Sequence, residues 1–193
     1  MKNLIKSLAY QLVKLLINIL KRFNAGRYII EQLSLNVSKI IIEIPEKNIN
    51  LKFYSPNRLN NFRIKTFFSK EPETINWINN FDKNSIFFDI GANIGLYSCY
   101  AARKRNCKVI AFEPSVFNLE LLSKNIYLNS LSKNVIIVPT PISNETKTAE
   151  FNMSSTEAGG ALSTFGETYT HDGTRINNSF NYKMPGTKLD KIV

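Results

Sequence analysis

The chain has 193 residues, enough for one domain of ordinary size and a short additional segment. Hydrophobic residues make up 44% and charged residues 21% of it, a balance that excludes disorder along the whole chain. The two cysteines form no C-x-x-C pair and the chain has one histidine, which excludes a disulfide scaffold and a structural zinc site. We therefore expect reduced thiols and no metal.

The net charge of +10 is distributed unevenly along the chain. Residues 1–85 contain 14 basic and 6 acidic residues, whereas residues 86–193 contain 11 and 9. Residues 1–27 contain basic residues and no acidic residue. This pattern indicates a basic arm attached to a nearly neutral domain. It argues against nucleic acid as the partner, because phosphate contacts need a basic face at the binding site.

The basic arm is predicted to be an amphipathic helix within residues 1–27. Its apolar residues recur at helical spacing, at Leu4, Leu8, Leu12, Leu15, Leu16 and Ile19. Lys14 and Asn18 interrupt the apolar run, so we expect no transmembrane span, and no small-residue cleavage site follows it. Two alternatives remain: a helix lying on anionic lipid, or a helix packed on the body of the protein.

Residues 28–84 are interpreted as a lead-in segment of short strands and a helix. A β-branched strand is predicted at Lys39–Ile44, ended by Pro45, with Leu51–Tyr54 as its partner. Pro72 is expected to begin a helix in which Trp77 and Ile78 face the core. A turn-rich stretch at residues 79–84 marks the boundary before the next segment.

Residues 85–193 are predicted to form an α/β domain with a parallel sheet. Strands are expected at 85–90, 108–112 and 135–138, with helices at 96–102 and from an N-cap at Ser115 to Asn129. Alternating strands and helices at this spacing are typical of βαβ units. Residues 153–165 are expected to form a hairpin or a mobile loop.

A glycine-rich turn follows the first of these strands, at Gly91–Gly95. Ligands of such sheets bind beyond the carboxyl ends of the strands, where glycines allow the backbone to come close. Glu113 follows the neighbouring strand, where a carboxylate can accept hydrogen bonds from both ribose hydroxyls. Together these features predict a cofactor that contains a nucleoside.

The turn has the pattern Asp89-x-Gly91-x-Asn93-x-Gly95, which is neither G-x-G-x-x-G nor a P-loop. The leading acid would repel a pyrophosphate but suits the amino group of methionine. S-adenosylmethionine is therefore the predicted cofactor. The alternative is an ordinary tight turn with a charge at a strand end.

The phrases FFDIGANIGLYS (Phe87–Ser98) and AFEPSVFNLELLSKNIYLN (Ala111–Asn129), with KEPETINWI (Lys70–Ile78) upstream, resemble the FkbM-type family of class I methyltransferases. The resemblance covers about residues 62–193. It implies a Rossmann-like fold and methyl transfer from S-adenosylmethionine, mostly to a hydroxyl oxygen of a sugar, glycan, lipid or secondary metabolite. The implied cofactor-binding residues are Asp89, Gly91, Ala92, Asn93 and Gly95 in the turn, Glu113 at the ribose and Ser143 along the adenine.

The resemblance also implies a fourth core strand after TKLDKIV (residues 187–193), the last residues of the sequence. We therefore expect the amino-terminal part of a methyltransferase, truncated after about the third core strand and inactive alone. No catalytic residue is assigned, and His171 is expected to lie in an exposed turn.

Two further hypotheses remain beside the enzyme. The chain is alternatively a non-enzymatic membrane-surface protein that uses its basic helix, or, less in keeping with its charge, a nucleic-acid binder. A combined hypothesis is a cytoplasmic methyltransferase held at the inner face of the membrane, near lipid-linked glycans.

Overall fold

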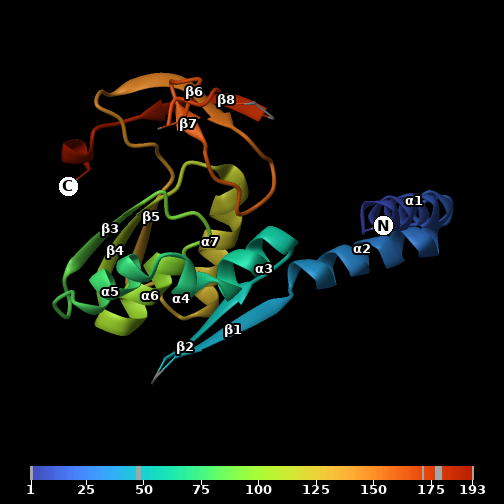
Figure 1. Ribbon diagram of the computed structural model, residues 1–193, viewed down its shortest axis with the longest axis horizontal. Coiled ribbons are helices and arrows are strands. Elements are labelled where there is room, and N and C mark those ends of the chain that lie inside the picture. The colour runs from blue at the N-terminus through green and yellow to red at the C-terminus, as the bar shows by residue number, and fades with distance from the viewer. Residues whose placement is uncertain (1, 47–48, 171, 177–179, 193) are drawn as a thin grey trace. The chain divides into compact units, whose positions relative to one another are not determined.

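The computed structural model describes residues 2–46, 49–170, 172–176 and 180–192, which form two compact units, Met1–Ile40 and Ile41–Val193 (Figure 1). The first unit extends to Ile40, beyond the boundary predicted after residue 27, because a helix runs across that boundary. Residues 41–84, interpreted as a separate lead-in segment, belong to the same unit as the segment that carries the glycine-rich turn.

The first unit is a pair of helices, α1 (Lys2–Leu20) and α2 (Asn24–Ser38). The helix predicted from the apolar spacing is confirmed as α1, whereas α2 was not predicted. Gly26 is buried, and a Cβ atom there would lie 2.2 Å from the carbonyl oxygen of Leu20. Glycine therefore allows the first turn of α2 to approach the end of α1 closely.

By length and composition, α1 is apolar enough to cross a membrane. Its window Asn3–Leu20 has a mean hydropathy of 1.2, and 0% of it is buried within the described structure. Eighteen helical residues span about 27 Å, close to the roughly 30 Å of a hydrocarbon core. Signal sequences and helices of soluble proteins pass the same test, so the expectation that α1 does not span a membrane stays a prediction.

The second unit contains a parallel sheet in the order β3-β4-β5. Its elements along the chain are β3 (Ile86–Ile90), α6 (Leu96–Arg105), β4 (Lys108–Phe112), α7 (Val116–Leu128) and β5 (Val135–Val138). The three predicted strands and both helices are confirmed, with α6 three residues longer than expected. This βαβαβ arrangement is Rossmann-like, and it brings the carboxyl ends of β3 and β4 to one edge.

The core of this sheet is built by the inward residues of the strands and by α6. In β4 the buried Val109 and Ala111 alternate with the exposed Lys108 and the partly exposed Ile110, as expected for side chains on opposite faces, and Phe112 at the carboxyl end is also buried. Tyr100 is fully buried in α6, and its hydroxyl donates a hydrogen bond to Oδ1 of Asn79 at 2.9 Å. Both cysteines, Cys99 and Cys107, are free and buried.

An antiparallel hairpin of β1 (Ile41–Glu46) and β2 (Ile49–Tyr54) precedes this sheet. The prediction that Pro45 ends the first strand is wrong, since Pro45 pairs with Asn50 inside the ladder. β1 has β2 as its partner in a two-stranded sheet, and an edge strand tolerates the missing N–H of proline. Asn125 of α7 and Asn129, the residue that caps the carboxyl end of α7, accept hydrogen bonds from the backbone of β2, each at 2.9 Å.

Helices α3 (Arg58–Lys65), α4 (Phe67–Lys70) and α5 (Pro72–Asn79) follow the hairpin. α5 begins at Pro72 as predicted, and Ile78 is buried. Trp77, however, is 59% exposed, which corrects the expectation that it faces the core. Ile78 shares its helix face with Ile75, three residues earlier, whereas Trp77 lies to the side of that face.

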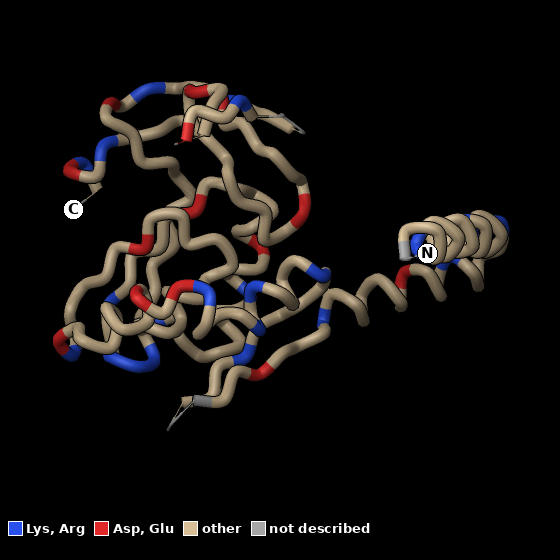
Figure 2. Tube along the Cα trace, in the orientation of Figure 1, with Lys and Arg blue, Asp and Glu red and all other residues tan. Residues whose placement is uncertain are grey.

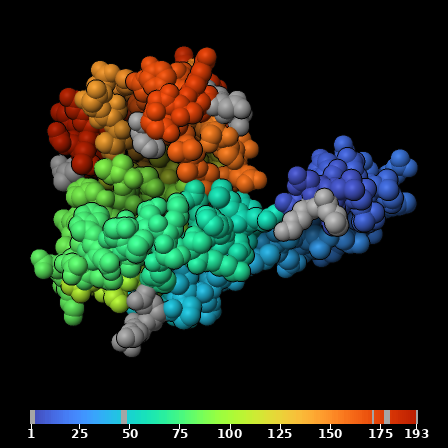
Figure 3. All heavy atoms as spheres, viewed as in Figure 1, coloured from blue at the N-terminus to red at the C-terminus, as the bar shows by residue number. Residues whose placement is uncertain are grey.

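A second sheet of the order β7-β6-β8 is antiparallel and consists of β6 (Lys147–Met153), β7 (Thr164–Phe165) and β8 (Phe180–Gly186). The hairpin predicted near residues 153–165 is present, because β6 pairs with β7 through Phe151 and Phe165. Residues 154–163 connect these two strands. In Figure 3 this orange segment rests against the turquoise surface of α3.

Candidate cofactor-binding site

The turn after β3 has a backbone that explains its residue pattern. Gly91, Asn93 and Gly95 have φ angles of 83°, 53° and 84°, in the left-handed region that glycine and asparagine adopt most readily. The N–H groups of Gly91 and Ala92 both donate to the carbonyl oxygen of Phe112, at 2.9 Å each. The turn is thereby joined to the end of β4.

The two glycines of this turn meet different surroundings. A Cβ atom at Gly95 would lie 2.6 Å from Cδ1 of Leu122, because α7 packs closely there. A Cβ atom at Gly91 would meet nothing within 4 Å. Gly95 therefore serves packing, whereas Gly91 leaves open space where a ligand can approach the backbone.

Glu113 connects the turn to the start of α7. The residue is 5% exposed. Its Oε2 accepts a hydrogen bond from the N–H of Asn93, and its Oε1 accepts one from the N–H of Ser115, both at 2.8 Å. Ser115 stands at the predicted N-cap, but its side chain makes no capping hydrogen bond. Burial raises the pKa of Glu113, while hydrogen bonds from Ser115, Asn93 and Asn118 oppose this and the charge of Asp89 adds to it.

Asp89 lies at the same edge of the sheet but faces α6. Its Oδ2 accepts a hydrogen bond from Oγ of Ser98 at 2.5 Å, and the residue is 8% exposed. Burial raises the pKa of Asp89, and hydrogen bonds from the side chain and backbone of Ser98 oppose the shift. Ser98 belongs to the first turn of α6, so the carboxylate lies near the positive end of that helix.

A hollow of about 190 Å³ lies beside the turn. Its lining combines the turn, the end of β4, α7 and the second sheet with its loop: Gly91, Asn93, Glu113, Pro114, Asn118, Phe151, Gly160, Ala161, Leu162 and Ser163. Sites for drug-sized ligands usually measure about 300–1,000 Å³, so a whole nucleoside cofactor needs more room than this hollow offers. Three of the predicted site residues, Gly91, Asn93 and Glu113, line this hollow together.

The other described site residues that were predicted do not line this hollow. Ala92 is buried beneath the turn, and Asp89 and Gly95 face α6 and α7. Ser143 lies beyond β5, where its N–H donates to the carbonyl oxygen of Thr187 at 2.9 Å. His171 falls outside the described residues.

Three asparagines hold the loop of residues 154–163; the sequence pattern pointed to Asn93, whereas Asn60 and Asn118 were not predicted. The carbonyl oxygen of Gly160 accepts hydrogen bonds from Nδ2 of Asn93 at 2.7 Å and Nδ2 of Asn118 at 3.2 Å. The N–H of Gly159 donates to Oδ1 of Asn118 at 2.8 Å. Nδ2 of Asn60 donates to the carbonyl oxygen of Ala158 at 3.0 Å. The Gly159–Gly160 pair was the available signal, since Gly159 has a φ of 88° and lies against Asn60.

Metal chemistry receives no support from the side-chain arrangement. Within the described residues, no group of three or more histidine, cysteine, aspartate and glutamate side chains could hold a metal ion.

The chain matches no known protein-family model. It is similar to the methyltransferase sdnD of Sordaria araneosa, with 42% identity over 59 residues. The match covers 30% of this chain and 23% of that protein, so the chain spans about a quarter of the length of this curated relative. This similarity is to a methyltransferase, and the FkbM-type assignment stays a prediction.

Solved structures with partial likeness include TYW2 of P. horikoshii in complex with MeSAdo, at 23% identity and a TM-score of 0.38, covering 52% of this chain and 36% of that chain. M. jannaschii TYW2 in complex with AdoMet has 24% identity and a TM-score of 0.36, covering 51% and 42%. The SAM-dependent methyltransferase from Agrobacterium tumefaciens has 12% identity and a TM-score of 0.36, covering 51% and 32%.

The two glycines of the turn give a matched pair of variants for stability. We expect Gly91→Ala to lower the free energy of unfolding by about 1–2 kcal/mol, the cost of a left-handed alanine. Gly95→Ala has the same backbone cost and also forces Leu122 aside, which adds about 1–3 kcal/mol. Urea unfolding of both variants measures the difference, and equal losses would contradict the assigned packing role of Gly95.

The buried carboxylate of Asp89 predicts a pH dependence of stability. Its pKa is raised above the ordinary 3.8, so the folded protein holds this proton more tightly than the unfolded chain does. The resulting stabilisation is fully present below pH 3.8 and is lost as the pH rises through the folded-state pKa. Between pH 3.8 and the folded-state pKa, the free energy of unfolding of the wild type should fall as the pH rises. That of Asp89→Asn should fall less steeply, and the two slopes should differ by at most about 1.4 kcal/mol per pH unit.

Urea unfolding at a series of pH values measures these slopes. Asp82→Asn, at an exposed carboxylate of the same unit, is the control and should retain the wild-type slope. Parallel curves for Asp89→Asn and the wild type would contradict the prediction.

Proposed function

We propose that the protein is an S-adenosylmethionine-dependent methyltransferase, or a part of one. The proposal rests on one hydrogen bond. The N–H of Asn93, in the turn after β3, donates to the carboxylate of Glu113, which follows β4, and so connects the ends of these two strands. A glycine turn and an acid at adjacent strand ends form a place for a nucleoside with its ribose. The similarity to a curated methyltransferase supports the same conclusion.

The residues at this edge of the parallel sheet have the chemistry to bind the separate parts of S-adenosylmethionine. The open face of Gly91 allows the nucleoside to approach the backbone. The two oxygens of Glu113 have about four lone-pair positions, so they can accept ribose hydroxyls in addition to the N–H groups of Asn93 and Ser115. Asp89 supplies negative charge near the cationic amino group of the methionine part. When bound, the cofactor supplies an electrophilic methyl group on a sulfonium.

For the acceptor, we propose a hydroxyl of a sugar, glycan or secondary metabolite, as the FkbM-type resemblance implies. The nearly neutral charge of residues 86–193 supports a small acceptor over nucleic acid. Transfer to a hydroxyl also needs a base to take its proton. No described residue is assigned that role.

Binding of S-adenosylhomocysteine to the full chain, measured by isothermal titration calorimetry, tests the cofactor proposal. We expect Glu113→Gln to weaken binding about 10- to 100-fold, because hydrogen bonds to a charged group contribute about 1.5–3 kcal/mol each. Glu120→Gln, on the exposed side of α7, is the matched control and should bind as the wild type does.

Circular dichroism of each variant shows whether it remains folded. Failure of the wild type to bind S-adenosylhomocysteine would contradict the proposed function. Equal binding by the wild type and a folded Glu113→Gln variant would contradict the assignment of Glu113.

We also propose that the first unit places the protein at the cytoplasmic face of an anionic membrane, whether the remainder is an active enzyme or a passive domain. Residues 1–40 contain seven Lys and Arg residues and one acid, Glu31, a contrast with the mixed charges of the second unit (Figure 2). Large apolar residues of α1 are exposed by 46% to 65%. A basic helix with exposed apolar side chains is suited to a lipid interface.

Flotation of the full chain with vesicles that contain phosphatidylserine tests this placement. Lys6→Glu/Lys14→Glu should lower the affinity about 10- to 30-fold, since each basic residue near the surface contributes about 1 kcal/mol. Lys83→Glu/Lys133→Glu, with the same charge change in the second unit, should leave it unchanged. Binding that is equal in all three proteins would contradict the proposal, and binding that resists high salt would indicate insertion of α1 instead.

A further inference from the structure

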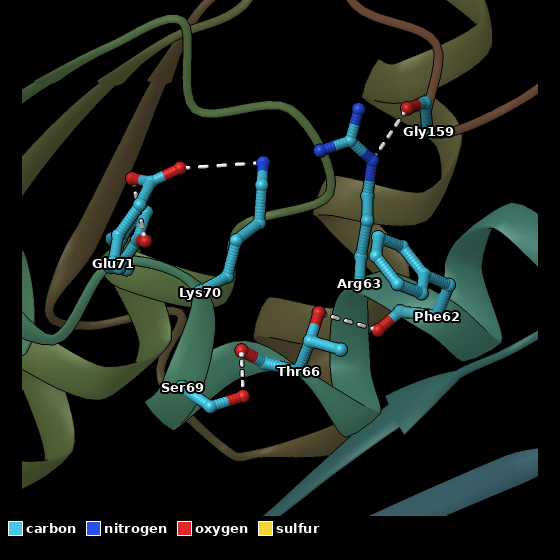
Figure 4. Close-up of polar contacts among 8 residues, drawn as sticks. Phe62, Arg63, Thr66, Ser69, Lys70, Glu71 and Gly159 are labelled. Atoms are coloured by element: carbon cyan, nitrogen blue, oxygen red, sulfur yellow. Dashed lines mark hydrogen bonds and ion pairs between the residues drawn. The ribbon is translucent and has the colours of Figure 1, made fainter.

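Arg63 is a half-buried cation whose guanidinium is held in one orientation. It lies on α3, and its Nε donates a hydrogen bond to the carbonyl oxygen of Gly159 at 2.8 Å (Figure 4). Burial lowers the pKa of Arg63, and the nearby Glu71 and Tyr97 oppose the shift. An arginine keeps its charge under such conditions, so the half-buried group is a fixed positive charge.

The two terminal nitrogens of this guanidinium remain available. Among the described residues, Arg63 makes its hydrogen bond through Nε alone, and the dashed line from its guanidinium in Figure 4 runs to Gly159. Glu71 is the nearby acid, but its carboxylate is engaged by Nζ of Lys70 at 3.4 Å and by the hydroxyl of Tyr97 at 2.8 Å. Arg63 therefore presents a planar pair of donors, the geometry that binds carboxylates in a bidentate manner.

Arg63 is linked to the turn of the candidate site through two consecutive residues of the loop of residues 154–163. Gly159, which holds Nε, is followed by Gly160, whose carbonyl oxygen accepts the hydrogen bond from Nδ2 of Asn93. Burial raises the pKa of Tyr97, in the first turn of α6, as do the hydrogen bond to Glu71 and the negative charges of Glu71 and Asp89, whereas the charge of Arg63 lowers it. Through Gly159 and Gly160, Arg63 is connected to Asn93 in the turn that leads into α6, whose N-terminal end also favours an anion.

We propose that Arg63 binds the carboxylate of the amino-acid part of the cofactor, an inference that rests on the proposed function. The amino-acid part is a zwitterion, and this end of the turn has charges of both signs, with Arg63 for the carboxylate and Asp89 near the ammonium. The hydrogen bond to Gly159 orients the guanidinium before the ligand arrives, which lowers the entropic cost of binding. Because methyl transfer requires alignment of donor and acceptor, fixing this end also positions the methyl group.

Two ligands that share one nucleoside distinguish this role from a purely structural one. S-adenosylhomocysteine has the amino-acid part, whereas 5′-methylthioadenosine has a methyl group in its place. We expect Arg63→Met to weaken binding of S-adenosylhomocysteine to the full chain at least tenfold and to change binding of 5′-methylthioadenosine less than twofold. Arg63→Lys, which retains the charge but not the paired donors, should lie between Arg63→Met and the wild type.

The matched control is Arg58→Met, the same substitution at an exposed position of the same helix. It should bind both ligands as the wild type does. Calorimetry at a fixed salt concentration measures all eight pairs of protein and ligand, and circular dichroism shows that each variant is folded.

The remaining outcomes overturn the inference in separable ways. If Arg63→Met weakens both ligands equally, Arg63 acts by holding the loop of residues 154–163 and not by binding a carboxylate. If it weakens neither, any carboxylate that Arg63 binds belongs to the acceptor. If the wild type binds neither ligand, the proposed function itself fails, and this inference fails with it.

Discussion

The hydrogen bond between the N–H of Asn93 and the carboxylate of Glu113 is the interaction on which the candidate site depends. It joins the turn after β3 to the end of β4, and the second oxygen of Glu113 extends this link to the start of α7. The carboxylate of a residue that is 5% exposed is costly to bury, and the backbone N–H groups offset this cost. One acid therefore both shapes the edge of the sheet and places a charge where a ligand can reach it.

The loop that connects β6 and β7 of the second sheet is held at this edge by hydrogen bonds to its backbone and not by apolar packing alone. Asparagines from α3, the turn and α7 hold three consecutive residues, 158–160, through their carbonyl and N–H groups. The loop that these contacts fix forms one wall of a hollow of about 190 Å³. Hydrogen bonds of this kind are individually modest, so several of them together hold this wall.

The two units differ in how far their apolar side chains are buried. In the second unit Tyr100, Val109 and Leu122 are fully buried between helices and strands. In the first unit, α1 has apolar side chains with no buried residue in its apolar window, and the accompanying charges are mostly positive. Such a composition is suited to a lipid interface, which offers both hydrocarbon and anionic headgroups. The charge of the chain is thus a property of its helical arm more than of its sheet.

The sequence by itself determined the βαβαβ order and the turn of the candidate site. Apolar runs between turn residues mark β3, β4 and β5, and glycine or asparagine stands wherever the turn needs a positive φ. The tertiary structure alone decided that Trp77 is exposed, that Ser143 does not line the hollow, and that Arg63 contacts Gly159. The physical reason is that spacing reports local geometry, whereas contacts between residues 96 apart depend on how whole elements pack.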